Sequence, residues 1–192
     1  MDLQRIAVKL YLEDEDALSP DEAFRIFNAW IPNTPGEVLI DVTAYRHVGH
    51  GPLALLVGHE ADYALDSTDG RPGLLYRRKQ PVSGTTPQRL TAALLAALGA
   101  CRRLEVDAGQ AAALRFRGDE LVLSVYDRLR APNEAGTLEA VRPALEGVLG
   151  HLFAGAPFEL ERDPDPRHLF AVRVRSGAAS AAVLLEHLSA HS

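Results

Sequence analysis

Residues 53–79 read LALLVGHEADYALDSTDGRPGLLYRRK, and this stretch decides the fold. Short, mainly apolar runs cover 53–57, 61–66 and 73–79, and each run predicts a β-strand. The connection between the last two runs contains the pair Asp69-Gly70, which is typical of a hairpin turn. Three consecutive short strands without an intervening helix argue against a doubly wound parallel sheet, in which strands and helices alternate strictly.

Further strands and helices are predicted on both sides of this stretch. Alternating apolar residues predict a strand over 6–12, and apolar residues on both faces of 37–45 predict a strand at the centre of a sheet. Ser19-Pro20-Asp21-Glu22 predicts a helix start with a capping box, and Thr85-Thr86-Pro87-Gln88 opens a second helix. The remaining expected elements are strands over 111–116, 120–126, 158–161 and 169–174, and helices over 137–153 and 178–189.

This order of elements predicts an α+β fold. We expect a mixed, largely antiparallel sheet packed by about four helices, in a single domain over residues 1–192. The order between residues 73 and 161 also fits the ferredoxin-like βαββαβ arrangement, either as a true substructure or as a coincidence of counting. Cys101 falls on the apolar stripe of the second helix, which predicts a buried and inert thiol.

The composition of the chain excludes several classes of protein. Of its 192 residues, 47% are hydrophobic and 24% charged, and the net charge is -6. A disordered chain would be less apolar, and a nucleic-acid-binding or membrane-binding protein needs clustered positive charge. One cysteine cannot build a disulfide framework or a multi-cysteine metal site. No apolar run is long enough to span a bilayer, and no targeting segment is visible, so we expect a cytoplasmic protein.

The sequence contains no Walker A loop, Gly-x-Gly-x-x-Gly turn, His-Glu-x-x-His motif or nucleophile elbow. Its densest group of chemically able side chains comprises His47, His50, His59, Glu60 and Asp62. If these side chains converged, they could bind a divalent metal ion or perform general acid–base catalysis. The alternative is that they are ordinary polar residues of loops and strand ends.

A second candidate is an anion-binding site at Arg71 and Arg77, because arginine side chains bind carboxylates and phosphates. Alternation along a strand, however, places Arg77 and Lys79 on one face and Arg78 on the other. The run is therefore not one patch, and the alternative is a charged strand exposed to solvent.

Four segments resemble a group of uncharacterised bacterial proteins, and the resemblance covers most of the chain. The segments are 40–42, 45–48, 58–63 and 73–79, which read IDV, YRHV, GHEADY and GLLYRRK. No activity is assigned to that group, so the resemblance implies a bacterial, cytoplasmic origin and no catalytic residue.

Three hypotheses about function follow. The first is a non-enzymatic accessory protein that binds a protein partner or a small ligand. The second is a small enzyme, with or without a divalent metal, that uses the histidine cluster. The third is a regulatory domain that binds an anion through Arg71 and Arg77. A homodimer through an unpaired hairpin edge is compatible with each of them.

Overall fold

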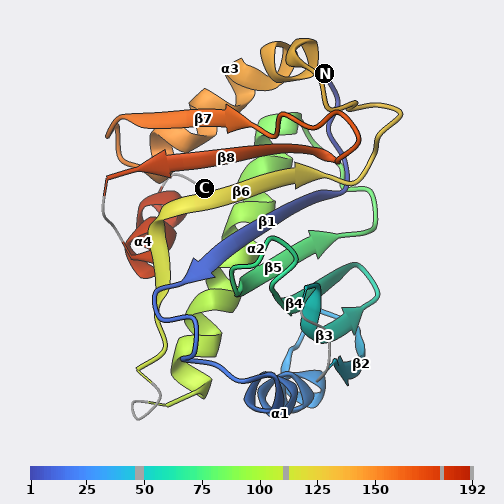
Figure 1. The fold of residues 1–192 in the computed structure, drawn as a ribbon, viewed down its shortest axis with the longest axis vertical. Helices are drawn as coiled ribbons and strands as arrows, with labels where there is room; N and C mark the ends of the chain where they lie inside the picture. The colour runs from blue at the N-terminus through green and yellow to red at the C-terminus, as the bar shows by residue number, and fades with distance from the viewer. Residues whose placement is uncertain (46–49, 110–112, 178–179, 191–192) are drawn as a thin grey trace.

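The computed structural model describes residues 1–45, 50–109, 113–177 and 180–190. Within these ranges it contains one eight-stranded antiparallel sheet and four α-helices (Figure 1). The strands are β1 (Ile6–Leu12), β2 (Leu39–Ala44), β3 (Pro52–Gly58), β4 (Ala61–Asp66), β5 (Gly73–Arg78), β6 (Phe116–Val125), β7 (Phe158–Arg162) and β8 (Phe170–Ser176). The helices are α1 (Pro20–Trp30), α2 (Thr86–Asp107), α3 (Ala135–Leu152) and α4 (Ala181–Ser189), and a short 3-10 helix, η1 (Ile31–Asn33), follows α1.

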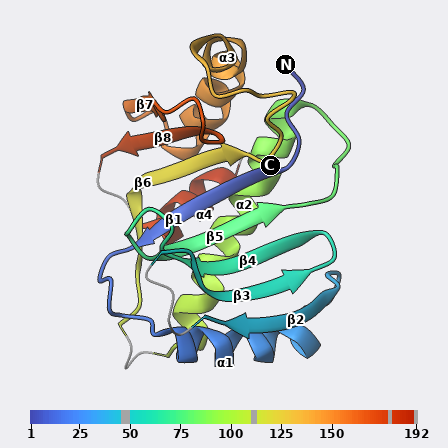
Figure 2. The same cartoon turned by 45° about the vertical axis from the view of Figure 1, so that its right-hand side comes forward.

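The strands are arranged in the order β2-β3-β4-β5-β1-β6-β8-β7, which Figure 2 shows from one edge to the other. Every neighbouring pair is antiparallel. The predicted α+β class is therefore confirmed. The ferredoxin-like order is not confirmed, because β1 lies between β5 and β6, and because residues 116–125 form one strand where two were expected.

Local signals predict where the first two helices begin. Ser19 accepts a hydrogen bond from the backbone of Glu22, whose side chain accepts one from the Ser19 backbone, so the predicted capping box is present. Thr85 and Gln88 form the same arrangement at the start of α2. These pairs satisfy backbone N–H groups that have no partner within the helix, and they fix where each helix starts.

Strand β2 is an edge strand, so its predicted central position is wrong. Apolar residues do occur on both faces of this segment. However, the side chains of Val38, which directly precedes β2, and of Ile40 are exposed, with relative accessibilities of 64% and 58%. The pairing of β2 with β3 is irregular between Leu39 and Asp41, and the Asp41 carboxylate accepts a hydrogen bond from the N–H of Val42. A bulge and an occupied backbone donor are features that protect sheet edges from pairing with other chains.

All four α-helices lie on one face of the sheet (Figure 1). Helix α2 packs on β1 and β5, α1 packs on β2 and β3, and α4 packs on β6, while α3 packs against α2 and α4. Cys101 lies on the buried face of α2, as predicted, and burial raises the pKa of its thiol. Among the described residues, no helix packs closely on β4, and none has the length and apolarity that a membrane crossing requires.

Candidate functional site

A groove lies between α1 and α2, beside the part of β4 that carries Tyr63, where no described helix packs its backbone closely on the strand. It contains two adjoining cavities of about 230 Å³ each, which share Glu37, Tyr63 and Ala96. We call this space the β4 groove. The first cavity is lined by Gln4, Arg5, Ile6, Glu37, Glu60, Ala61, Tyr63, Tyr76, Arg78, Val82, Arg89, Ala92, Ala93 and Ala96. The second is lined by Trp30, Thr34, Glu37, Leu39, Tyr63, Leu95, Ala96, Gly99, Ala100 and Arg103.

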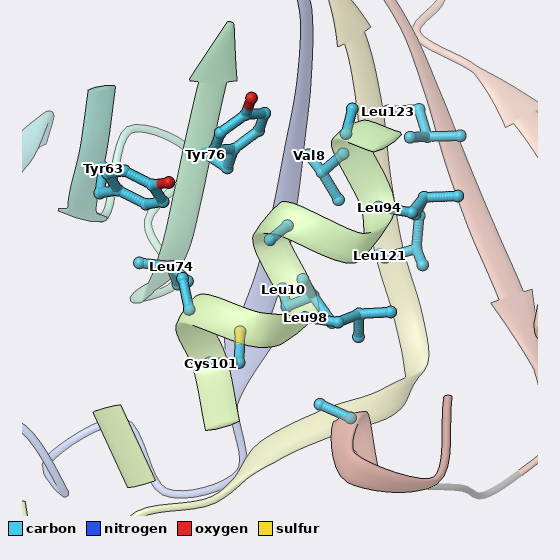
Figure 3. Packing of buried hydrophobic residues seen from close by; sticks show 14 of the residues in the cluster. Val8, Leu10, Tyr63, Leu74, Tyr76, Leu94, Leu98, Cys101, Leu121 and Leu123 are labelled. Carbon is cyan, nitrogen blue, oxygen red and sulfur yellow. The ribbon is translucent and has the colours of Figure 1, made fainter. Parts of the chain in front are cut away.

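The floor of the β4 groove is aromatic. Tyr63 on β4 and Tyr76 on β5 are paired in register, and their ring centroids are 5.4 Å apart. Figure 3 shows both rings projecting from adjacent strands beside α2. Trp30 at the end of α1 meets the Tyr63 ring edge-on, with centroids 6.1 Å apart. These rings form a rigid and largely buried apolar surface, because Trp30, Tyr63 and Tyr76 are only 3%, 5% and 5% exposed.

Both tyrosine hydroxyls remain protonated at neutral pH. Burial and the nearby Glu37 carboxylate raise the pKa of Tyr63, whose hydroxyl donates to that carboxylate at 2.9 Å. Burial also raises the pKa of Tyr76, although the Arg78 guanidinium opposes the rise. The two phenols can therefore donate hydrogen bonds, and neither is poised to lose its proton near pH 7.

Charged side chains surround the aromatic floor, and most of them are paired. Arg78 forms an ion pair with Glu60 at 2.8 Å. Arg89 pairs with Asp2 and also donates to the carbonyl oxygens of Val82 and Leu3. These interactions hold the guanidinium groups in place at the mouth of the first cavity.

The far end of the β4 groove is closed by contacts between the C-terminal ends of α1 and α2. The Trp30 indole donates to Asp107 at 2.7 Å, and Arg103 lies over the Trp30 ring at 4.4 Å from its centroid. Arg103 also donates to the Thr34 hydroxyl at 2.6 Å. The wall along α2 includes the small residues Ala96, Gly99 and Ala100, and a side chain at Gly99 would meet nothing within 4 Å. The groove is thus open because α2 carries small residues there.

The described histidines of the predicted cluster are not brought together. His50 precedes β3 and His59 follows it, and both are exposed, so the length of this seven-residue strand separates them. His47 lies outside the described residues. Among the residues that the structure does describe, no group of three or more His, Cys, Asp or Glu side chains is arranged to hold a metal ion. A metal site that depends on His47 stays a prediction.

The two carboxylates of that cluster lie on opposite faces of the sheet. Glu60 pairs with Arg78 at the β4 groove, on the helix-covered face. Asp62 is buried on the other face, where it pairs with Arg77 at 2.5 Å and Lys79 at 2.7 Å. The predicted alternation along β5 is therefore confirmed, with Arg77 and Lys79 on one face and Arg78 on the other.

The two arginines of the predicted anion site already have carboxylate partners. Arg71 donates to both oxygens of Glu120 at 3.1 Å and lies 3.9 Å from the centroid of the Tyr11 ring. Arg77 is paired with Asp62. An anion would have to compete with these buried carboxylates for each guanidinium, and an anion site at Arg71 and Arg77 stays a prediction.

Sequence reasoning did not find the β4 groove. Its residues come from the N-terminus, from α1 and the segment that follows it, from β4 and β5, and from α2, and they follow no motif. The small residues Ala92, Ala96 and Gly99 recur at helical spacing, which was the one available signal, but the same pattern is typical of ordinary helix packing.

No protein-family model matches this chain, and no curated protein matches it either.

Proposed function

We propose that this protein is a non-enzymatic accessory protein that binds a small ligand in the β4 groove. The observation that carries the proposal is the pair of adjoining cavities between α1 and α2, which are bordered by aromatic rings and charged side chains. Ligand sites in proteins are typically concave, largely apolar and supplied with a few polar groups that orient the ligand, and the β4 groove has these properties.

The dimensions of the groove favour a small ligand over the other expected partner, a protein. The cavities are about 230 Å³ each, and contacts of Trp30 and Arg103 close one end. A protein segment that covered a surface of standard interface size would need a larger exposed area.

The side chains of the groove favour binding over catalysis. The residues that line the two cavities include no His, Cys or Ser. The groove tyrosines have raised pKa values, so they are poor bases and poor nucleophiles at neutral pH. We also propose a cytoplasmic location, which suits a fold whose single cysteine is buried and unpaired.

A groove-filling variant tests the proposal. Ala96 borders both cavities, so Ala96→Phe should occupy the space that a ligand needs. A library of small apolar and aromatic compounds would be screened by thermal shift, because a bound ligand raises the melting temperature. Compounds that stabilise the unmodified protein should lose at least tenfold in affinity for Ala96→Phe.

The matched control is Ala140→Phe, which makes the same change on an exposed position of α3. This variant should bind the same compounds as the unmodified protein. Circular dichroism would establish that both variants are folded. Compounds that bound Ala96→Phe and the unmodified protein equally would place the site elsewhere, and a screen without any stabilising compound would count against ligand binding.

A further inference from the structure

The two edges of the sheet differ in how their outward backbone groups are protected. At the β2 edge, Tyr45 donates its N–H to Leu53 of β3, so by alternation along the strand the N–H of Val42 faces away from β3. The Asp41 carboxylate occupies that N–H, and the pairing with β3 is irregular next to it. The β2 edge is therefore protected against pairing with a further strand.

The β7 edge has neither protection. Its pairing with β8 is regular, and among the described elements only β8 packs closely on it (Figure 1). The N–H of Asp163, directly after β7, donates to Ala171 of β8. By the same alternation, the N–H and C=O groups of Phe158, Leu160 and Arg162 face away from β8. Within the described ranges no other residue hydrogen-bonds to these outward groups, so they are available to a further strand.

Acidic and apolar side chains alternate along β7. Glu159 and Glu161 are exposed on the helix-free face of the sheet, whereas Phe158 and Leu160 are half-buried against the core on the other face. Glu161 pairs with Arg175 of β8 at 2.9 Å and is still 62% exposed. Glu159 forms no ion pair with any residue that the structure describes. The free edge of β7 is thus lined by negative charge on one face.

This charge makes a second copy of the chain a poor partner for β7. A ladder built from the outward groups of two β7 strands in antiparallel orientation pairs Leu160 with itself, with Phe158 or with Arg162. Each of these registers places Glu159 or Glu161 of one copy directly opposite a glutamate of the other. Like charges directly opposite each other destabilise a sheet.

Strand β8 shows which sequence suits β7. It sets alternating basic and apolar residues against the acidic and apolar residues of β7: Arg175 opposite Glu159, Val174 opposite Leu160 and Arg173 opposite Glu161. The outer side of β7 offers the same alternation with its backbone groups free.

From this asymmetry we infer that the edge of β7 binds an extended segment of a partner protein in which basic and apolar residues alternate. The segment joins the sheet as a further antiparallel strand. Backbone hydrogen bonds then supply the affinity, and basic side chains opposite Glu159 and Glu161 supply the specificity. Four strands separate β7 from β4, so this surface is distinct from the β4 groove and the inference goes beyond the proposed function.

Capped five-residue peptides, which match the length of β7, test the inference. Val-Arg-Val-Arg-Val has the inferred pattern. Val-Glu-Val-Glu-Val reverses the charge, and Val-Val-Arg-Arg-Val keeps the composition but breaks the alternation. Isotope-labelled protein would be titrated with each peptide and followed by NMR. The first peptide should shift the amide signals of β7 and slow the exchange of the Leu160 amide at least tenfold, and both controls should bind at least tenfold more weakly.

N-methylated peptides separate strand pairing from simple charge attraction. In the inferred register the N–H of the central valine donates to the C=O of Leu160, whereas the arginine N–H groups face away from β7. Methylation of the central valine nitrogen should therefore abolish binding. Methylation of an arginine backbone nitrogen leaves the same charge and the same ladder, so it should leave the affinity unchanged.

A charge-reversal variant tests the specificity. Glu159→Lys should reduce the preference for the arginine peptide over the glutamate peptide at least tenfold. The matched control Glu139→Lys makes the same change at an exposed position of α3 and should bind like the unmodified protein. Circular dichroism would establish that both variants are folded. Ala96→Phe, in the β4 groove, should also bind the arginine peptide unchanged.

Three results would overturn the inference. One is equal binding of the three peptides, or binding that survives methylation of the central valine, because either would mean attraction without strand pairing. Another is the absence of binding of the arginine peptide at millimolar concentration. The third is protection of the β7 amides that rises with protein concentration in the absence of peptide, which would identify a second copy of the chain as the occupant.

Discussion

Lys9 is one of only two lysines in the chain, and it is 5% exposed in the middle of the sheet. Its ammonium lies 2.9 Å from Asp66 and 2.5 Å from Asp69, and the Tyr11 hydroxyl donates to Asp69 at 2.6 Å. These contacts fasten the β4–β5 connection over the helix-free face of the sheet. A buried charge is tolerated only when it is paired and hydrogen-bonded, and here both conditions are met.

The two lysines form a natural comparison of buried and exposed ion pairs. Lys9→Ala leaves Asp66 buried without its cation, and we expect this variant to lose about 3 kcal/mol of unfolding free energy. Lys79→Ala removes a lysine whose side chain is 31% exposed, and Asp62 keeps its ion pair with Arg77. That loss should stay below about 1 kcal/mol. Urea denaturation measures the free energy of unfolding of both variants. Equal losses would mean that the contacts of Lys9 with Asp66 and Asp69 stabilise the fold no more than an exposed ion pair does.

Several helices and strands could be predicted from the sequence because their signals are local. The capping pairs Ser19–Glu22 and Thr85–Gln88 mark helix starts, and the pair Asp69-Gly70 marks the connection between two strands that do form a hairpin. The order of strands depends on contacts between distant parts of the chain, which periodicity does not report. For this reason β2 was expected at the centre of the sheet although it lies at the edge.

The candidate site was harder to predict for the same reason. His50 and His59 are near in sequence, but an extended strand carries its ends apart, so they do not meet. In contrast, Arg5, Tyr63 and Arg89 are distant in sequence and line one cavity. Nothing in their local sequence marks them as neighbours, because the pairing of β5 with both β1 and β4 and the packing of α2 bring them together.

Helix α2 offers a test of how the groove is kept open. Gly99 lies inside the helix, where glycine is less stable than alanine by roughly 0.5–1 kcal/mol, and an added Cβ would meet nothing within 4 Å. We expect Gly99→Ala to raise the melting temperature by about 1–4 °C. Gly147→Ala on α3 should stabilise similarly, because a Cβ there also meets nothing within 4 Å.

The two glycine variants should differ in ligand binding. Only Gly99 borders the β4 groove, so only Gly99→Ala should weaken the binding of compounds that fill the second cavity. Differential scanning calorimetry with and without such a compound measures both effects. A destabilised Gly99→Ala protein would show that the helix needs glycine for packing, and an unchanged affinity would show that Gly99 does not shape the site.

In the whole molecule, the groove follows from a difference between the two halves of the chain in the number of strands that two helices have to cover. The first half runs strand, helix, strands, helix from β1 to α2, and the second repeats this order from β6 to α4. In each half the last strand returns beside the first, so β5 pairs with β1 and β8 pairs with β6. The second half places two helices on three strands, and these helices pack together. The first half spreads two helices over five strands, so neither α1 nor α2 packs closely on β4, and the groove lies there.

This architecture makes β1 the strand on which both halves depend. It is buried along its whole length and pairs with β5 on one side and β6 on the other, whereas β2 and β7 form the two edges of the sheet. Opening β1 must separate the halves, so its amides should exchange with solvent only through global unfolding. The amides of β2 and β7 can exchange through local opening at the edges.

Native-state hydrogen exchange measured against denaturant should therefore give β1 the free energy of global unfolding and give both edge strands lower values with weaker denaturant dependence. Edge amides protected as strongly as those of Val8 and Leu10 would show that the edges are covered, for instance by a second copy of the chain, and a rise of that protection with protein concentration would identify such a dimer.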